Sequence, residues 1–149
     1  MDKIVLISCS SKKNITNTKT KAKDLYSSTL FKFNINYAHS LLPSKIFILS
    51  AKYGLVGLED EIEYYNVTLN GMSLNSRKVW AWKVLNRLKE VSDLEEDEFI
   101  FLAGKKYREF IISHLKYFST PLDVGGIGKQ LQYLKSKINN KDEAQKLCE

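Results

Sequence analysis

Residues 4–13 read IVLISCSSKK, an apolar run that ends in hydroxyl residues and lysines. Related runs, each ending in small or hydroxyl residues followed by lysine, return at residues 46–54 (IFILSAKYG), 99–107 (FIFLAGKKY) and 121–129 (PLDVGGIGK). Apolar runs of roughly four to eight residues, bounded by turn residues, are typical of strands covered on both faces. Because ligands bind at the carboxyl ends of strands in an open α/β sheet, we expect the four loops to meet at one edge. Such an edge suits an anion, above all a phosphate.

Helical patterns separate these runs. The first strand is predicted at 3–9, followed by a polar loop to residue 27, and the second strand at 45–50. Ser27 or Ser28 can cap a helix between them, and Pro43 stops it. Residues 51–72 show little periodicity and contain three glycines, which predicts an ordered connection.

The second half of the chain continues the alternation. Ser73 or Asn75 can cap the next helix, which leads through an acidic turn into a third strand near residues 99–102. An amphipathic helix is predicted over residues 107–115, where apolar residues recur at i, i+3, i+4 and i+7. A short strand at 119–124 and a helix at 127–138 follow.

These elements predict one α/β domain of three layers, with a small and mostly parallel sheet. The domain is expected to span residues 1–138, and residues 139–149 to form a polar C-terminal tail. A chain of 149 residues is long enough to bury a core of its own.

The composition favours a polyanionic partner. The net charge is +6, with 44% hydrophobic and 27% charged residues, as in ordinary globular proteins. No run reaches the ~20 apolar residues of a membrane span and no signal peptide is evident, so we expect a cytoplasmic protein without a membrane partner. Cys9 and Cys148 are too few for a disulfide framework, and His39 and His114 are isolated. We therefore expect neither a metal nor another cofactor, and the oligomeric state stays open.

The loops after the apolar runs supply the candidate phosphate ligands. Hydroxyl and backbone N–H groups hold phosphate oxygens, and lysine adds a point charge. The first loop is no Walker loop, because it lacks the glycine frame. Cys9 has no evident base in the sequence and is interpreted as a small buried residue. The candidates are Ser8, Ser10, Ser11, Lys12, Lys13, Ser50, Lys52, Gly104, Gly125, Gly126, Gly128 and Lys129. The glycines at 125–128 suit either an anion at a helix N-terminus or a tight turn.

Two aspartates are candidates for chemistry. A carboxylate near phosphates is unfavourable unless it holds a lysine, a metal or a sugar hydroxyl. Asp24 and Asp60 are therefore candidates for catalysis or ribose recognition, although a structural ion pair with a loop lysine explains either one equally well. Tyr26, Tyr53, Tyr65 and Tyr107 are candidates for stacking on bases, or for capping the core.

Several of these motifs resemble the YaaA family. The segment 48–55, ILSAKYGL, followed by Asp60, Ile62 and Tyr65, is similar to that family's I-L-S-x-x-Y-G-L and D-x-I-x-x-Y. The opening at 8–12 and the segment 101–107 are similar to its S-P-A-K and L-A-S-x-x-Y motifs, and the order agrees over about two-thirds of the chain. Small uncharacterised prokaryotic and phage domains with S-C-S-x-K, D-L-Y and L-S-A-K-Y-G-L motifs resemble the chain more closely still.

This resemblance implies an association with peroxide stress and DNA binding, and with nucleobase or DNA-modification pathways. The chain is much shorter than typical YaaA proteins and lacks their additional DNA-contacting elements.

Two hypotheses follow. The first is a nucleotide- or nucleic-acid-directed domain that binds phosphate at the carboxyl edge of the sheet and cleaves or exchanges an N-glycosidic bond, with Asp24 or Asp60 at the sugar. The second is a non-catalytic DNA-binding protein of stress response or mobile-element biology. A protein-interaction module fits the loops less well.

Overall fold

The core of the fold is a five-stranded sheet with the first strand at its centre. The computed structural model describes the backbone of residues 1–148 and the side chains of residues 1–137. Strand order is β4-β3-β1-β6-β7; β1 lies parallel to β3 and β6, β6 parallel to β7, and only β4 runs antiparallel. The strands are β1 (Lys3–Ser8), β3 (Lys45–Ser50), β4 (Gly54–Gly57), β6 (Glu98–Leu102) and β7 (Tyr117–Ser119), and β2 (Thr20–Lys21) pairs with β5 (Glu61–Ile62) in a separate ribbon.

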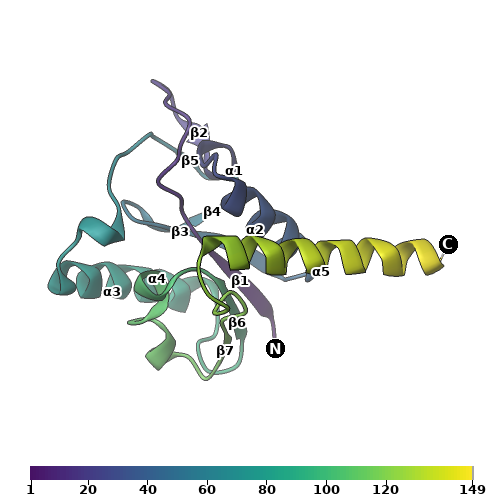
Figure 1. Ribbon diagram of the computed structural model, residues 1–149. Coiled ribbons are helices and arrows are strands. Elements are labelled where there is room, and N and C mark those ends of the chain that lie inside the picture. Colours follow the sequence, from purple (N-terminus) through teal and green to yellow (C-terminus); the bar gives the residue numbers. More distant parts are fainter. Residues whose placement is uncertain (149) are drawn as a thin grey trace.

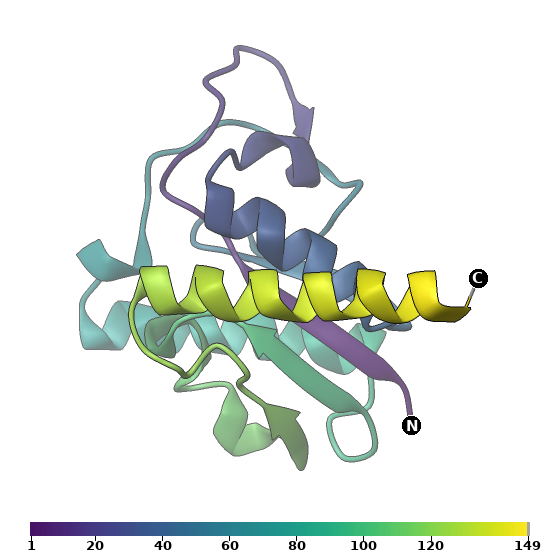
Figure 2. The same cartoon turned by 45° about the vertical axis from the view of Figure 1, so that its right-hand side comes forward.

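Helices cover both faces of this sheet. In Figures 1 and 2, α2 and α5 lie together on one side and α3 lies on the other, which gives the three-layer α/β arrangement that the sequence predicts. The helices are α1 (Ala22–Leu25), α2 (Thr29–Ser40), α3 (Leu74–Val91), α4 (Lys105–Arg108) and α5 (Ile127–Cys148), with short 3-10 turns η1 (Leu69–Gly71) and η2 (Ile112–His114).

Burial explains why the apolar runs form the sheet. Residues 4–7 of β1 and 99–102 of β6 are all buried, because both faces of these central strands are covered. Ser28 caps α2 by accepting the Phe31 N–H, and Ser73 caps α3 by accepting the Ser76 N–H. The predicted strands at 3–9 and 45–50 and the two capped helices are thus confirmed within one or two residues.

Four local predictions need correction. Within the ordered connection predicted at 51–72, residues 54–57 form an additional edge strand, β4, because Gly54 adopts φ +78° and turns the chain back along β3. The predicted helix at 107–115 is instead the single turn α4 followed by η2. Glu109, between them, is paired with Arg77 of α3 at 2.6 Å, so a tertiary contact accompanies the break in the helical pattern.

The C-terminal corrections concern the last strand and helix. The strand predicted at 119–124 is β7 at Tyr117–Ser119; the apolar run ends up in a turn, where the Asp123 N–H donates to the Thr120 carbonyl and Leu122 enters the core. Helix α5 does not end near residue 138 but continues to Cys148, since no glycine or proline interrupts the sequence between them. Within the described part of the chain, no helix is long and apolar enough to span a membrane.

Candidate functional site at the carboxyl edge of the sheet

The parallel strands bring three of the lysine-bearing loops to one edge of the sheet. Strands β1, β3 and β6 run in the same direction and in close register, with Ser8 opposite Leu49 and Ile7 opposite Leu102. The loops that follow them therefore leave from the same edge, as the sequence predicts. The Cys9 N–H, just past β1, donates to the Leu49 carbonyl at 3.0 Å and holds the first loop against the second.

The glycine loop before α5 reaches the same edge. Arg108 of α4, which follows β6, lies 3.8 Å from the Asp123 carboxylate in the turn that leads to Gly125. Gly125 has φ +134°, and the Gly125 carbonyl accepts from the Gln130 side chain at 3.1 Å. Gly126, Gly128 and Lys129 are exposed at the start of α5. The fourth run thus contributes a tight turn and a helix N-terminus, although no strand directly precedes it.

A buried group of hydroxyls and one thiol lies beneath these loops. We call it the tyrosine cluster and define it as Cys9, Tyr26, Ser50, Tyr65 and Tyr107. The Tyr26 and Tyr65 hydroxyls are 2.6 Å apart, and the Ser50 hydroxyl donates to Tyr65 at 2.9 Å. The Cys9 Sγ lies 3.4 Å from the Tyr107 hydroxyl. The cluster thus consists of two hydrogen-bonded groups, Tyr26 with Tyr65 and Ser50, and Cys9 with Tyr107, whose members come from separate segments.

Ser50 ties the cluster to the second loop. Its hydroxyl accepts the Tyr53 N–H at 3.1 Å, and its carbonyl accepts the Trp80 indole N–H at 2.8 Å. The Trp80 ring also packs edge-on against Tyr107, with centroids 5.7 Å apart. The serine that ends β3 is therefore fully buried and serves the architecture of the edge.

Lys13 and Lys52 flank this cluster on its aromatic side. The Lys13 ammonium lies 4.5 Å from the Tyr65 ring centre, and the Lys52 ammonium lies 5.2 Å from that of Tyr53. The two tyrosine rings meet edge-to-face at 5.7 Å, so the two lysines flank one aromatic pair. Lys13 is half-buried, and this burial lowers the pKa of its ammonium, partly opposed by the charge that Cys9 carries when ionised.

Burial also perturbs the cluster's hydroxyls. It raises the pKa of Tyr26 to about 12, and it raises the pKa of Tyr65 and Tyr107 well above that of an exposed tyrosine. Negative charge at Cys9 adds to the increase for all three hydroxyls. The three tyrosine hydroxyls therefore stay protonated at neutral pH and offer neutral hydrogen-bond donors.

The four tyrosines proposed for base contacts differ in exposure. Tyr26 and Tyr65 are 2% and 4% exposed and pack against other side chains in the core. Tyr53 and Tyr107 are only partly buried. The structure thus presents ring surface from Tyr53 and Tyr107 and uses the other two as internal supports.

The remaining phosphate candidates lie in the first and third loops. Ser8 and Ser10 are partly buried and Ser11 and Lys12 are exposed, and the Ser10 hydroxyl donates to the Lys12 carbonyl at 2.6 Å. Gly104 is exposed and caps the four-residue helix α4.

Neither candidate aspartate belongs to the tyrosine cluster. The Asp60 carboxylate accepts the Gly57 N–H at 2.8 Å, and it lies beside Lys45 and Ile46 at the opposite, amino-terminal end of β3. Its role there is to close the turn after β4. Asp24 is exposed in α1, near a groove that α2 borders.

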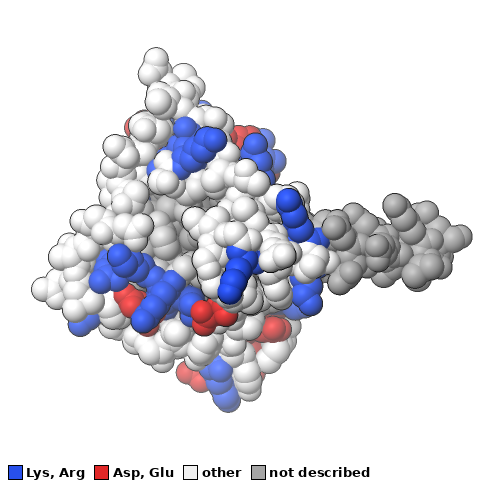
Figure 3. Space-filling model, viewed as in Figure 1, with Lys and Arg blue, Asp and Glu red and all other residues white. Residues whose placement is uncertain are grey.

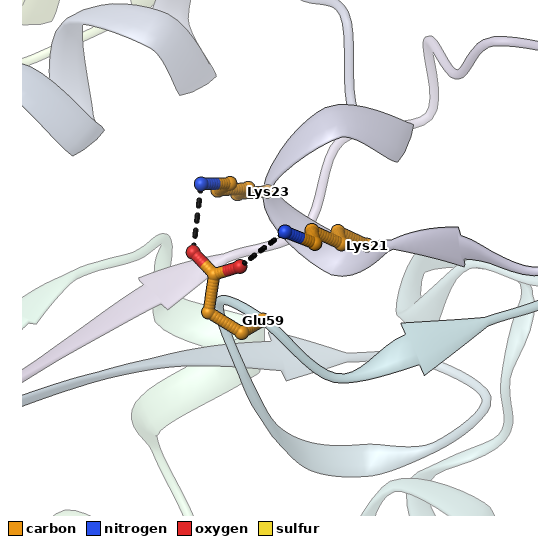
Figure 4. Close-up of polar contacts among 3 residues, drawn as sticks. All are labelled: Lys21, Lys23 and Glu59. Atoms are coloured by element: carbon orange, nitrogen blue, oxygen red, sulfur yellow. Dashed lines mark ion pairs between the residues drawn. The ribbon is translucent and has the colours of Figure 1, made fainter.

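The carboxylate that pairs with loop lysines is a third residue, Glu59. It bridges Lys21 at 2.9 Å and Lys23 at 2.7 Å, as Figure 4 shows. Hydrogen bonds from Lys23 and Lys21 lower the pKa of Glu59. These ion pairs are exposed and fasten the turn after β4 to α1. The ion pair with a lysine that the sequence offered for Asp60 is therefore formed by its neighbour Glu59.

Positive charge predominates on the face that Figure 3 presents. Lysine and arginine side chains are spread over the region of α1 and β2 and over α3 and α4, with acidic side chains between some of them. Among the residues with described side chains, no group of three or more acidic, histidine or cysteine residues is arranged to hold a metal ion. His114 instead packs against Trp82, with ring centroids 5.2 Å apart.

Comparisons with known proteins identify one family. A family model described as "Family of unknown function (DUF6884)" matches residues 4–136, which include every strand of the sheet and all the loops of the edge. A search of curated proteins found no match, and neither did a search of solved structures.

Proposed function

The chain belongs to the DUF6884 family, whose function is unknown, and we propose its function from the geometry of the edge: a nucleotide- or nucleic-acid-directed domain that binds phosphate there. One observation carries the proposal. The loops after β1, β3 and β6 leave one edge of the sheet, where Lys13 lies over the ring of Tyr65 and Lys52 over the ring of Tyr53. In open α/β sheets this edge is where ligands bind. The resemblance to the YaaA family, on the residues quoted above, supports the same class of ligand.

The lysines of the edge are available to a phosphate, because no carboxylate of the described residues pairs with them. Within the described part of the chain, Lys12, Lys13 and Lys52 form no ion pair, whereas Lys21 and Lys23 are both engaged by Glu59. A half-buried lysine without a counterion is stabilised when an anion binds beside it. Tyr53, next to Lys52, adds an aromatic surface for a base. We also propose a cytoplasmic location, where such ligands are abundant.

An enzymatic form of this proposal depends on Asp24. N-glycosidic cleavage or base exchange needs a carboxylate at the sugar, to stabilise positive charge or to activate water. Asp60 lies at the other end of β3, so it is not part of this form of the proposal. Asp24 lies beside a groove together with Tyr26 of the cluster, which makes it the carboxylate to test for base release.

The alternative is a non-catalytic DNA-binding protein of stress response or mobile-element biology. The charge on the face in Figure 3 favours it. A protein that neutralises several phosphates loses affinity steeply between about 50 and 200 mM salt, whereas a mononucleotide site shows a shallow slope. The salt dependence of binding therefore separates a polymer ligand from a mononucleotide.

The test is binding of mononucleotides and of single- and double-stranded oligonucleotides by isothermal titration calorimetry at low salt. Lys13→Met should weaken binding by ~10-fold, because it removes a poorly solvated cation at the phosphate. Lys89→Gln is the matched control: Lys89 also lies over an aromatic ring, that of Trp82 on α3, but far from the edge. If no nucleotide or oligonucleotide binds, or if both variants bind as the wild type does, the proposal is wrong.

A further inference from the structure

A groove of about 470 Å³ opens on the α2 side of the edge. One wall is the first loop, held against α1 and the residues after it; the Asn14 N–H donates to the Leu25 carbonyl at 2.8 Å and the Ser27 N–H to the Lys12 carbonyl at 3.0 Å. The other wall is α2, which presents Phe31, Lys32, Ile35 and Asn36. The groove is thus formed by the first loop, α1 and α2, which follow one another in the sequence and are held together by backbone hydrogen bonds.

Polar groups on both walls are left without partners in the protein. Among residues with described side chains, the carboxylate of Asp24, the ammonium of Lys32 and the amide of Asn36 have no hydrogen bond or ion pair. The backbone of Asp24 is held in place, since its carbonyl accepts the Asn14 side-chain amide at 2.9 Å, while its carboxylate is exposed at the groove. One wall thus carries a carboxylate and the other a cation, and the lining also includes apolar side chains. Such a lining suits a ligand with hydroxyls for the carboxylate, a negative charge for the cation and a ring for the apolar surface.

The groove is continuous with the proposed phosphate site. Lys13 pairs through its backbone with Tyr26, and Tyr26 contributes to the groove while its hydroxyl belongs to the tyrosine cluster. The loop of Lys12 and Lys13 therefore forms the border between the groove and the edge. A ligand whose phosphate lies on this loop has its sugar and base within reach of the groove.

We propose that this groove is the nucleoside subsite of a ribonucleotide, and this inference rests on the proposed function. Asp24 accepts hydrogen bonds from the 2′- and 3′-hydroxyls, a role that carboxylates serve in other nucleotide sites. Ile35, which is only partly buried, covers the base above the buried ring of Phe31, and Lys32 adds a second cation on the helix wall. The groove should therefore bind ribonucleotides, which carry both hydroxyls, more tightly than 2′-deoxyribonucleotides.

The experiment compares the four ribonucleoside 5′-monophosphates with their 2′-deoxy counterparts by calorimetry, on the full chain. At least one ribonucleotide should bind ~10-fold or more tightly than its deoxy form, because the deoxy form leaves the carboxylate short of a hydrogen bond. Asp24→Asn should remove most of this preference. Asp60→Asn is the matched control, since its carboxylate lies elsewhere, and it should keep the preference. Amide NMR shifts should concentrate in residues 12–14, 24–27 and 31–36.

Lys32→Gln provides an independent arm. It should weaken the ribonucleotide and its deoxy form alike by several-fold and lower the salt slope, because it removes a cation that attracts the anionic ligand and leaves the hydroxyl contacts of Asp24 in place. Equal affinity for both sugars, or an unchanged preference in Asp24→Asn, overturns the groove assignment. If binding still depends on Lys13 in that case, the proposed function stands and only this inference is wrong. If no nucleotide binds at all, both are wrong.

Discussion

The hydroxyl of Tyr65 offers the sharpest test of the tyrosine cluster. Tyr65→Phe removes one oxygen atom and leaves the ring, so it tests the hydrogen bonds and not the packing. That hydroxyl lies 2.6 Å from the Tyr26 hydroxyl and 2.9 Å from the Ser50 hydroxyl, and all three residues are buried. Removing it leaves the Tyr26 hydroxyl without its partner and the Ser50 proton without its acceptor.

The expected loss follows from these contacts. Each hydrogen bond contributes roughly 1 kcal/mol net, and a buried hydroxyl left without a partner costs about 1–3 kcal/mol. We therefore expect Tyr65→Phe to lower the free energy of unfolding by about 2–4 kcal/mol. Tyr64→Phe is the control, because Tyr64 is only partly buried and its hydroxyl has no hydrogen bond among the described side chains; its change should stay within about 0.5 kcal/mol.

Urea unfolding of the wild type, Tyr26→Phe, Tyr65→Phe and the double variant measures the coupling between the two hydroxyls. The double variant leaves fewer stranded groups than the two single variants together, so its loss should be smaller than their sum by about 1–2 kcal/mol. Losses that add within about 0.5 kcal/mol would show that the two hydroxyls do not depend on each other. That result, or a Tyr65→Phe variant as stable as Tyr64→Phe, would refute the hydrogen bonds that link Tyr65 to Tyr26 and Ser50.

Two further predictions concern stability. Because the folded protein holds the tyrosine protons more tightly than the unfolded chain, the stabilisation from Tyr26 is complete below about pH 10 and is lost as the pH rises towards about 12. Thermal unfolding followed from pH 8 to 12 should show this decline, and a midpoint that stays constant above about pH 10 would contradict it. Leu42, the residue after the C-cap of α2, has φ +51° and an 85% exposed side chain, so Leu42→Gly should raise the free energy of unfolding by about 0.5–1 kcal/mol in urea unfolding, whereas Leu42→Ala should not.

The sequence predicts the sheet, and the meeting of its loops at one edge, because both depend on local patterns. Apolar runs such as residues 4–7 are long enough to identify strands, and parallel topology then places their loops together. Strand β4 was missed because Leu55 and Val56 are only two apolar residues between glycines, too few for a pattern. The helix predicted at 107–115 has the right spacing, but Arg108 and Glu109 form ion pairs with residues from other elements.

The parts of the candidate site that could not be predicted from the sequence depend on contacts between residues far apart in the chain. Cys9 and Tyr107 are 98 residues apart, and nothing in either segment indicates that they meet. The same holds for Trp80 and Ser50, which are 30 residues apart. Asp24 and Asp60 looked alike as acidic residues near aromatic ones, and only the antiparallel course of β4 takes Asp60 to the other end of β3.

The separation of the two aspartates narrows the chemistry that this edge can support. The tyrosine cluster contains no carboxylate, and its three tyrosine hydroxyls stay neutral at neutral pH, so these hydroxyls can donate hydrogen bonds but cannot act as an anionic base. In the enzymatic form of the proposed function, the carboxylate that stabilises positive charge at the sugar is therefore Asp24, on the wall of the groove. Ribose recognition and N-glycosidic chemistry consequently depend on the same carboxylate, and they differ in what Asp24→Asn removes: the preference for a ribonucleotide in the first case, the release of free base in the second.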